Sequence, residues 1–148
     1  MLLAFRTLKS EDKGIIDAFL KEQLKDEKGG IAYALVDNEG EVLVTGTVPD
    51  CDERYIGTAR SRAIMAVGIG KNTSEMTTNK TGDEFVDGMF SPGGVIIVAN
   101  EIIYGAIGVA GRPQPSKFIP FGRLNDHDLA FMSVEELKRK LLLEETIG

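Results

Sequence analysis

The side chains that could do chemistry in this chain are few, and its arginines stand out first. Arg60 and Arg62 lie in a stretch with helical spacing, and Arg112 and Arg123 bracket a segment that holds three of the five prolines. A guanidinium group is a planar fork of donors that binds carboxylates or phosphates through two bonds at once. In a chain of net charge −6, arginines that converge on one pocket would mark an anionic ligand. A single surface arginine, by contrast, ordinarily pairs with a neighbouring carboxylate at little net gain.

The only histidine of the chain, His127, lies between Asp126 and Asp128 in "NDHDLA". An imidazole beside a carboxylate can move a proton or ligate a metal. Adjacent residues on a helix diverge by about 100 degrees, so these three side chains would not converge on one ion. Carboxylates at the start of a helix also suit its dipole. We therefore expect no metal site here.

Two further chemical classes are disfavoured. Cys51 is the only cysteine, which excludes an intrachain disulfide and favours a reducing compartment. Its flanking aspartates, at positions 50 and 52, disfavour a reactive thiolate. "GIGK", which ends at Lys71, lacks the earlier glycine and the following Ser or Thr of a phosphate loop. Nucleotide binding is therefore not expected.

Five glycines occur among the nineteen residues of "GGVIIVANEIIYGAIGVAG", positions 93–111. Glycine inside a strand weakens the sheet unless another backbone must approach closely, so Gly105 and Gly108 predict packing beneath a helix. Gly93, Gly94 and Gly111 fall at strand ends, where backbone amides could meet a ligand. We therefore expect the middle of this stretch to lie in the core and its ends to border a ligand-binding site.

The elements that would position these residues follow from hydrophobic spacing and turn signals. Apolar residues recur at helical spacing after Ser10 and again in residues 54–70. Two β-rich pairs flank short polar turns and predict hairpins, over residues 31–48 and 95–110. Residues 71–84 predict a surface loop, and helix returns from Asp126, with Ser133 and Glu136 as a capping box that opens the last helix. Hairpins joined by tight turns and covered by helices define an α+β fold.

Composition limits the remaining classes. A chain of 148 residues is most simply one domain, spanning residues 1–148. No cluster of Lys and Arg is longer than residues 138–140, so a nucleic-acid surface is not expected. The N-terminal apolar run is too short for a signal peptide, and no run reaches the length of a membrane span. We expect a cytoplasmic protein.

"SPGGVIIVANEIIYGAIGVAG" followed by "DHDLA" resembles the GlcG/HbpS family, also called the haem-degrading domain family and related to the C-terminal domain of PduO. The matching blocks are the Pro-Gly-Gly at 92–94, the Gly-x-Ile-Gly-Val block at 105–111 and residues 126–130. "IAYALVDNEGEVLV" and "YIGTARSRAIMA" are similar to the family's first hairpin and following helix, with Arg62 where a lysine is usual. The family's "R-x-D-G-A" is absent after the second strand, and the segment between Gly111 and Asp126 is longer than usual.

The resemblance implies a profilin-like antiparallel sheet of about five strands covered by helices, and assembly into homo-oligomers. It also implies a small-molecule pocket, with haem as the cofactor of some relatives. Taken with the residues above, it indicates one ligand-binding set: Tyr55, Arg62, Gly93, Gly94, Gly111, Arg112, Asp126 and His127.

Three functions fit these observations. The first is a binding domain for haem or a related tetrapyrrole, with an axial ligand among His127, Tyr55, Tyr104 and the methionines. The second is an enzyme acting on a small carboxylate, held by Arg62 and Arg112, with Asp126 or His127 moving a proton. The third is a non-catalytic assembly subunit, in which the glycines serve packing alone.

Overall fold

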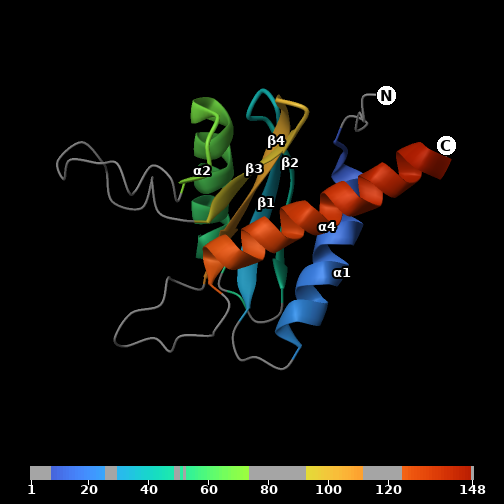
Figure 1. The fold of residues 1–148 in the computed structure, drawn as a ribbon. Helices are drawn as coiled ribbons and strands as arrows, with labels where there is room; N and C mark the ends of the chain where they lie inside the picture. The colour runs from blue at the N-terminus through green and yellow to red at the C-terminus, as the bar shows by residue number, and fades with distance from the viewer. Residues whose placement is uncertain are drawn as a thin grey trace.

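The computed structural model describes residues 8–25, 30–48, 51, 53–73, 93–111 and 125–147. Most of the expected loop after residue 73, and the segment 112–124 with Arg112, lie outside the described residues. The elements, in chain order (Figure 1), are η1 Ser10–Asp12, α1 Lys13–Leu24, β1 Ile31–Asp37, β2 Val42–Val48, α2 Arg54–Ile69, β3 Gly94–Ala99, β4 Ile102–Ala110 and α4 Asp126–Ile147.

The described strands form one antiparallel sheet in the order β2-β1-β4-β3. Each expected hairpin is present, and β1 joins them by pairing with β4, with Tyr33 opposite Val109. The predicted α+β class and antiparallel sheet are therefore confirmed. Four strands are described, one fewer than the expected number of about five.

The turns of both hairpins have identifiable causes. In the first, the Asp37 carboxylate accepts hydrogen bonds from the backbone N–H groups of Glu39 and Glu41, at 2.9 and 3.0 Å. In the second, Asn100 and Glu101 both have positive φ, 52° and 66°. Two consecutive residues with positive φ suit the twist of a two-residue hairpin.

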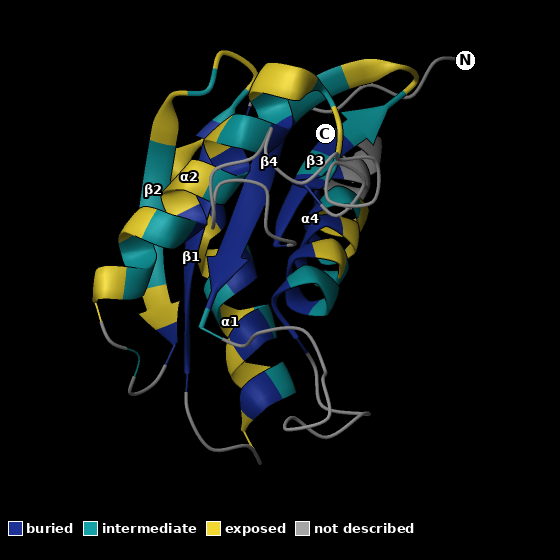
Figure 2. Ribbon diagram, turned by 90° about the vertical axis from the view of Figure 1, so that its left-hand side faces the viewer, coloured by how far each residue is buried: buried dark blue, intermediate teal, exposed yellow. Residues whose placement is uncertain are grey.

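Helices cover both faces of the sheet, and the two interfaces differ in composition. On one face α1 and α4 pack against large side chains of the strands, including Tyr33, Leu35, Ile97 and Ile107. On the other face α2 lies on alanines of β1 and β4, through alanines of its own. Figure 2 shows the buried residues concentrated along the strands and on the inner sides of the helices.

Gly108 explains how α2 approaches the sheet so closely. A Cβ atom added at Gly108 would overlap the backbone oxygen of Ala59 and lie 2.9 Å from the backbone nitrogen of Ala63. The prediction that Gly108 packs beneath a helix is therefore confirmed. Gly105 instead faces Leu8 and the backbone of Val36, so its close neighbour is a strand.

The last helix corrects the expectation of a capping box at Ser133. α4 runs without interruption from Asp126, and Ser133 is a buried interior residue with 1% exposure. The helix is capped instead by Asn125, whose side-chain oxygen accepts a hydrogen bond from the Asp128 N–H at 2.8 Å. The buried positions Leu129, Val134 and Leu137 continue across Ser133, so packing against the sheet overrides the local capping pattern.

Candidate functional site

The expected site residues at the strand ends lie at one end of the sheet. The Val109 N–H donates to the Gly93 carbonyl at 2.8 Å, and Gly111 follows Val109 by two residues. Gly111 itself lies against Gly30 and Ile31, at the start of β1. We call this end, where β3 begins and β4 ends, the Gly93 end of the sheet.

Arg62 reaches the Gly93 end from α2. Its Nη1 donates to the Val109 carbonyl at 2.6 Å and to the Asp126 carboxylate at 2.8 Å. The two charged side chains are 12% and 5% exposed, so this is a buried ion pair between α2 and the first residue of α4. It joins the helical layers on the two faces of the sheet.

Gly93 makes room for this ion pair. A Cβ atom at Gly93 would lie 2.8 Å from Nη1 and 2.9 Å from Cδ of Arg62, and the glycine has φ 139°. The guanidinium group therefore occupies the space that a side chain at position 93 would take. Its Nε is also buried and has no hydrogen-bond partner among the described residues.

The adjoining edge of the sheet is closed by two side chains that the sequence analysis did not single out. Thr73 Oγ1 accepts a hydrogen bond from the Gly94 N–H at 3.0 Å, and Asn72 Oδ1 accepts one from the Ile96 N–H at 2.9 Å. Both residues lie within four positions of Ile69, the last residue of α2. Their side chains accept hydrogen bonds from backbone N–H groups of the edge strand β3. Without these bonds, the same N–H groups would be free to pair with another strand. Their only sequence signal was their place in a polar segment.

Tyr55 and His127 belong to opposite faces of the sheet. Tyr55, on α2, packs with Cys51 and Ile56 against the small residues of β1 and β4. The Arg54 guanidinium carbon lies 5.4 Å from the centroid of the Tyr55 ring. His127 follows Asp126 in the first turn of α4, on the other face. One flat ligand seated against α4 would therefore meet His127 and not Tyr55.

His127 is half-buried, and its Nδ1 atom is fully buried without a hydrogen-bond partner among the described residues. The imidazole ring is 6.3 Å from the Phe131 ring, centroid to centroid, at an interplanar angle of 34°. Phe131 is 47% exposed. The start of α4 thus places a half-buried imidazole beside an exposed aromatic ring.

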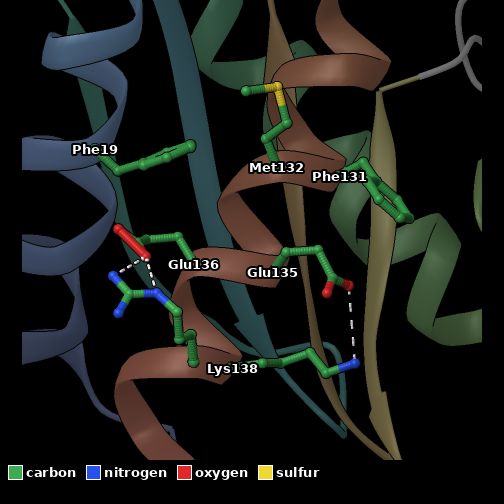
Figure 3. A pocket seen from close by; sticks show the side chains of 7 residues that line it. Phe19, Phe131, Met132, Glu135, Glu136 and Lys138 are labelled. Atoms are coloured by element: carbon green, nitrogen blue, oxygen red, sulfur yellow. Dashed lines mark hydrogen bonds and ion pairs between the residues drawn. The ribbon is translucent and has the colours of Figure 1, made fainter.

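A hollow of about 620 Å³ lies along the outer side of α4, one turn beyond His127. Phe19 of α1 lines it together with Phe131 and Met132 of α4 (Figure 3). Its remaining lining is charged and consists of Glu135, Glu136, Lys138 and Arg139. The hollow is separate from the Gly93 end, and the sequence analysis did not predict it. Its one sequence signal is that Phe131 and Met132 fall outside the buried stripe of the helix.

Metal-binding groups and membrane-crossing helices can both be assessed from the described residues. Across the described parts of the chain, no three His, Cys, Asp or Glu residues are grouped so that they could hold a metal ion. The helices described here also include none whose length and apolar character would let it cross a bilayer.

Solved structures with the same architecture include Klebsiella pneumoniae protein ORFY, with a TM-score of 0.71, 17% identity, and coverage of 91% of this chain and 93% of that one. The PduOC:heme complex matches with a TM-score of 0.68, 19% identity, and coverage of 88% and 95%. A double mutant of Streptomyces reticuli HbpS matches with a TM-score of 0.67, 23% identity, and coverage of 90% and 89%. These likenesses establish the fold.

The sequence itself settles the family. The model of the family described as "Haem degrading protein HbpS-like" matches residues 9–116. The chain therefore belongs to the HbpS-like family, and the resemblance drawn from its glycine-rich blocks is confirmed. No curated protein sequence matches the chain.

Proposed function

We propose that this protein binds haem or a related tetrapyrrole, with His127 as the axial ligand. The family is described as haem degrading, and PduOC, which has the same fold, was crystallised as a heme complex. Within this chain the proposal depends on one observation, the half-buried imidazole of His127 beside the exposed Phe131 ring.

The residues around His127 fit a tetrapyrrole. His127 is the only imidazole in the chain, and imidazole is a common axial ligand of haem iron. The exposed Phe131 ring beside it offers an apolar surface of the kind that a macrocycle covers. When bound, haem would supply an iron centre and two carboxylates.

The other members of the expected ligand set differ in whether their polar groups already have partners within the chain. Arg62 and Asp126 bind each other, and Gly94 donates its N–H to Thr73, so we assign these three to shaping the Gly93 end. Gly111 adjoins that end, and we propose that Arg112, directly after it, binds a carboxylate of the ligand. An enzyme that grips a small carboxylate with Arg62 has less support, because Arg62 Nη1 already bonds Asp126 and Val109.

A hemin titration of the purified protein tests the proposal. We expect a defined shift of the Soret band that saturates at one equivalent of haem, and we expect His127→Ala to abolish it. Tyr55→Phe is the matched control, because Tyr55 lies on the opposite face. A featureless titration at micromolar haem would refute haem binding. A shift lost in Tyr55→Phe but kept in His127→Ala would move the axial ligand to the α2 face.

We also propose that the protein is a cytoplasmic homo-oligomer. The single, half-buried Cys51 supports a reducing compartment, because no intrachain disulfide is needed. The resemblance to a family of oligomers supports self-association. The mass of the native protein by light scattering after size exclusion tests the second part, and a monomer at every concentration would refute it.

A further inference from the structure

The first turn of α4 is held at two points, one on each side of His127. On the N-terminal side, the Asp126 carboxylate pairs with Arg62 Nη1 at 2.8 Å. On the C-terminal side, the Asp128 N–H donates a hydrogen bond to the Asn125 side chain at 2.8 Å. The backbone of His127 therefore lies between two neighbours that are each fixed by a side-chain contact.

The start of a helix needs such contacts, because its first four backbone N–H groups have no partner within the helix. The first turn therefore opens more readily than the helix interior. His127 is the second residue of α4, and it is only half-buried. Core packing alone thus holds this imidazole incompletely, and the two contacts beside it limit the movement of its backbone.

The ion pair is the stronger of the two contacts, and it connects His127 to the other face of the sheet. Arg62 belongs to α2, which lies across the sheet from α4 (Figure 1), and its Nη1 also donates to the Val109 carbonyl at 2.6 Å. Gly93 leaves the space that the guanidinium group fills. Hydrogen bonds between charged groups that are 12% and 5% exposed are stronger than the neutral bond at Asn125.

We propose that Arg62 is a positioning residue for the axial ligand: through Asp126 it fixes the start of α4, and so the direction in which the His127 imidazole points. In this role Arg62 does not touch the ligand. A binding group that is already oriented loses less entropy on binding, so its affinity is higher. This inference rests on the proposed function and specifies how the axial ligand of that site is held.

Substitutions at the ion pair test this role. Arg62→Met leaves the Asp126 charge buried without Arg62, which destabilises the fold, so the double variant R62M/D126N is made as well, because it removes both charges. Arg62→Lys is the conservative variant, since an ammonium group can donate to both Asp126 and Val109 from one atom. Lys21→Met is the matched control, because it breaks an ion pair with Asp17 on α1 and leaves the start of α4 unchanged.

NMR of the free protein gives the first measurement. His127 is the only histidine, so protein without a histidine tag gives one set of imidazole signals. The Phe131 ring, 6.3 Å away between centroids, should shift these signals from their positions in the unfolded chain. We expect R62K and K21M to keep the shifted signals. We expect R62M/D126N to move them toward the unfolded positions and to lose the nuclear Overhauser effect between the two rings.

Hemin titration and electron paramagnetic resonance of the ferric complex give the second measurement. Removing a partner that orients a metal-binding histidine typically weakens metal binding by about 10–100-fold. We expect R62M/D126N to bind hemin at least about 10-fold more weakly than the unmodified chain, with signals from more than one axial geometry. R62K should bind within about 3-fold of the unmodified chain, and K21M should bind equally well.

The two measurements separate this inference from the proposed function. Imidazole signals that stay in place in R62M/D126N would refute positioning, and a lower Tm in that case would mean that Arg62 only stabilises the fold. Signals that move while hemin binds equally tightly would also refute it. In both cases His127-dependent haem binding would stand. An unmodified chain that binds no hemin would refute the proposed function and the axial role together.

Discussion

Gly108→Ala is the most direct test of how α2 is held against the sheet. The added methyl group would overlap the Ala59 carbonyl oxygen and sit 2.9 Å from the Ala63 backbone nitrogen, closer than ordinary van der Waals contact. Both neighbours are helix backbone, which cannot rotate away as a side chain can. α2 must therefore shift as a body, and its alanine contacts with β1 and β4 would loosen.

Overpacking of this kind costs about 1–3 kcal/mol, and a clash with backbone belongs at the upper end. For a domain of this size, about 3 kcal/mol lowers Tm by roughly 6–12 °C. Urea unfolding followed by circular dichroism measures the free energy of unfolding directly.

Gly57→Ala is the control, because Gly57 is exposed in the same helix and an added Cβ meets nothing within 4 Å. Replacing a helical glycine by alanine should stabilise the protein by about 0.5–1 kcal/mol. The two substitutions add the same methyl group, one to the sheet beneath α2 and one to α2 itself, and should act with opposite signs. If Gly108→Ala changed the free energy of unfolding by less than about 0.5 kcal/mol, the close packing of α2 would be refuted.

Two further substitutions probe buried polar groups. Burial raises the pKa of the Tyr33 phenol, with help from the nearby Asp17 carboxylate, which accepts its hydrogen bond at 3.2 Å. The unfolded chain therefore releases this proton first, so stability that is intact at neutral pH should fall above about pH 10, by up to 1.4 kcal/mol per pH unit. Urea unfolding from pH 8 upward should show that the free energy of unfolding falls less with pH in Tyr33→Phe than in the unmodified chain. If the free energy fell equally with pH in both proteins, the raised pKa of Tyr33 would be contradicted. Ser133→Ala removes a buried hydroxyl that has no partner among the described residues, so it should be neutral or stabilise by about 1 kcal/mol. A destabilisation above about 1 kcal/mol in the same assay would mean that Ser133 Oγ has a partner.

Local patterns predicted the secondary structure well because each hairpin and helix carries its own signals. The turn at Asp37 and Gly40 and the break at Asn100 and Glu101 are visible in the sequence, and the structure has strands on either side of each. The capping pattern at Ser133 failed because a four-residue motif contains no information about which helical face will be buried.

The contacts at the Gly93 end were beyond such reasoning. Arg62 and Asp126 are 64 positions apart, and no local period links them. Gly93 was predicted at a strand end, where it lies, but only the fold reveals that Arg62 fills the space above it. The hollow along α4 likewise depends on Phe19 of α1 lying beside Met132, a pairing that only helix packing creates.

The clamps at the Gly93 end have a consequence for how this domain can diversify. Thr73 holds the start of β3 through Gly94, and Arg62 ties Val109 to Asp126, so the chain is anchored on both sides of residues 74–92 and of residues 112–124. With both ends fixed, doubling the number of residues between them raises the entropic cost of closing the segment by only about 0.6 kcal/mol. Insertions or deletions between these anchors should therefore cost the four-stranded sheet little stability.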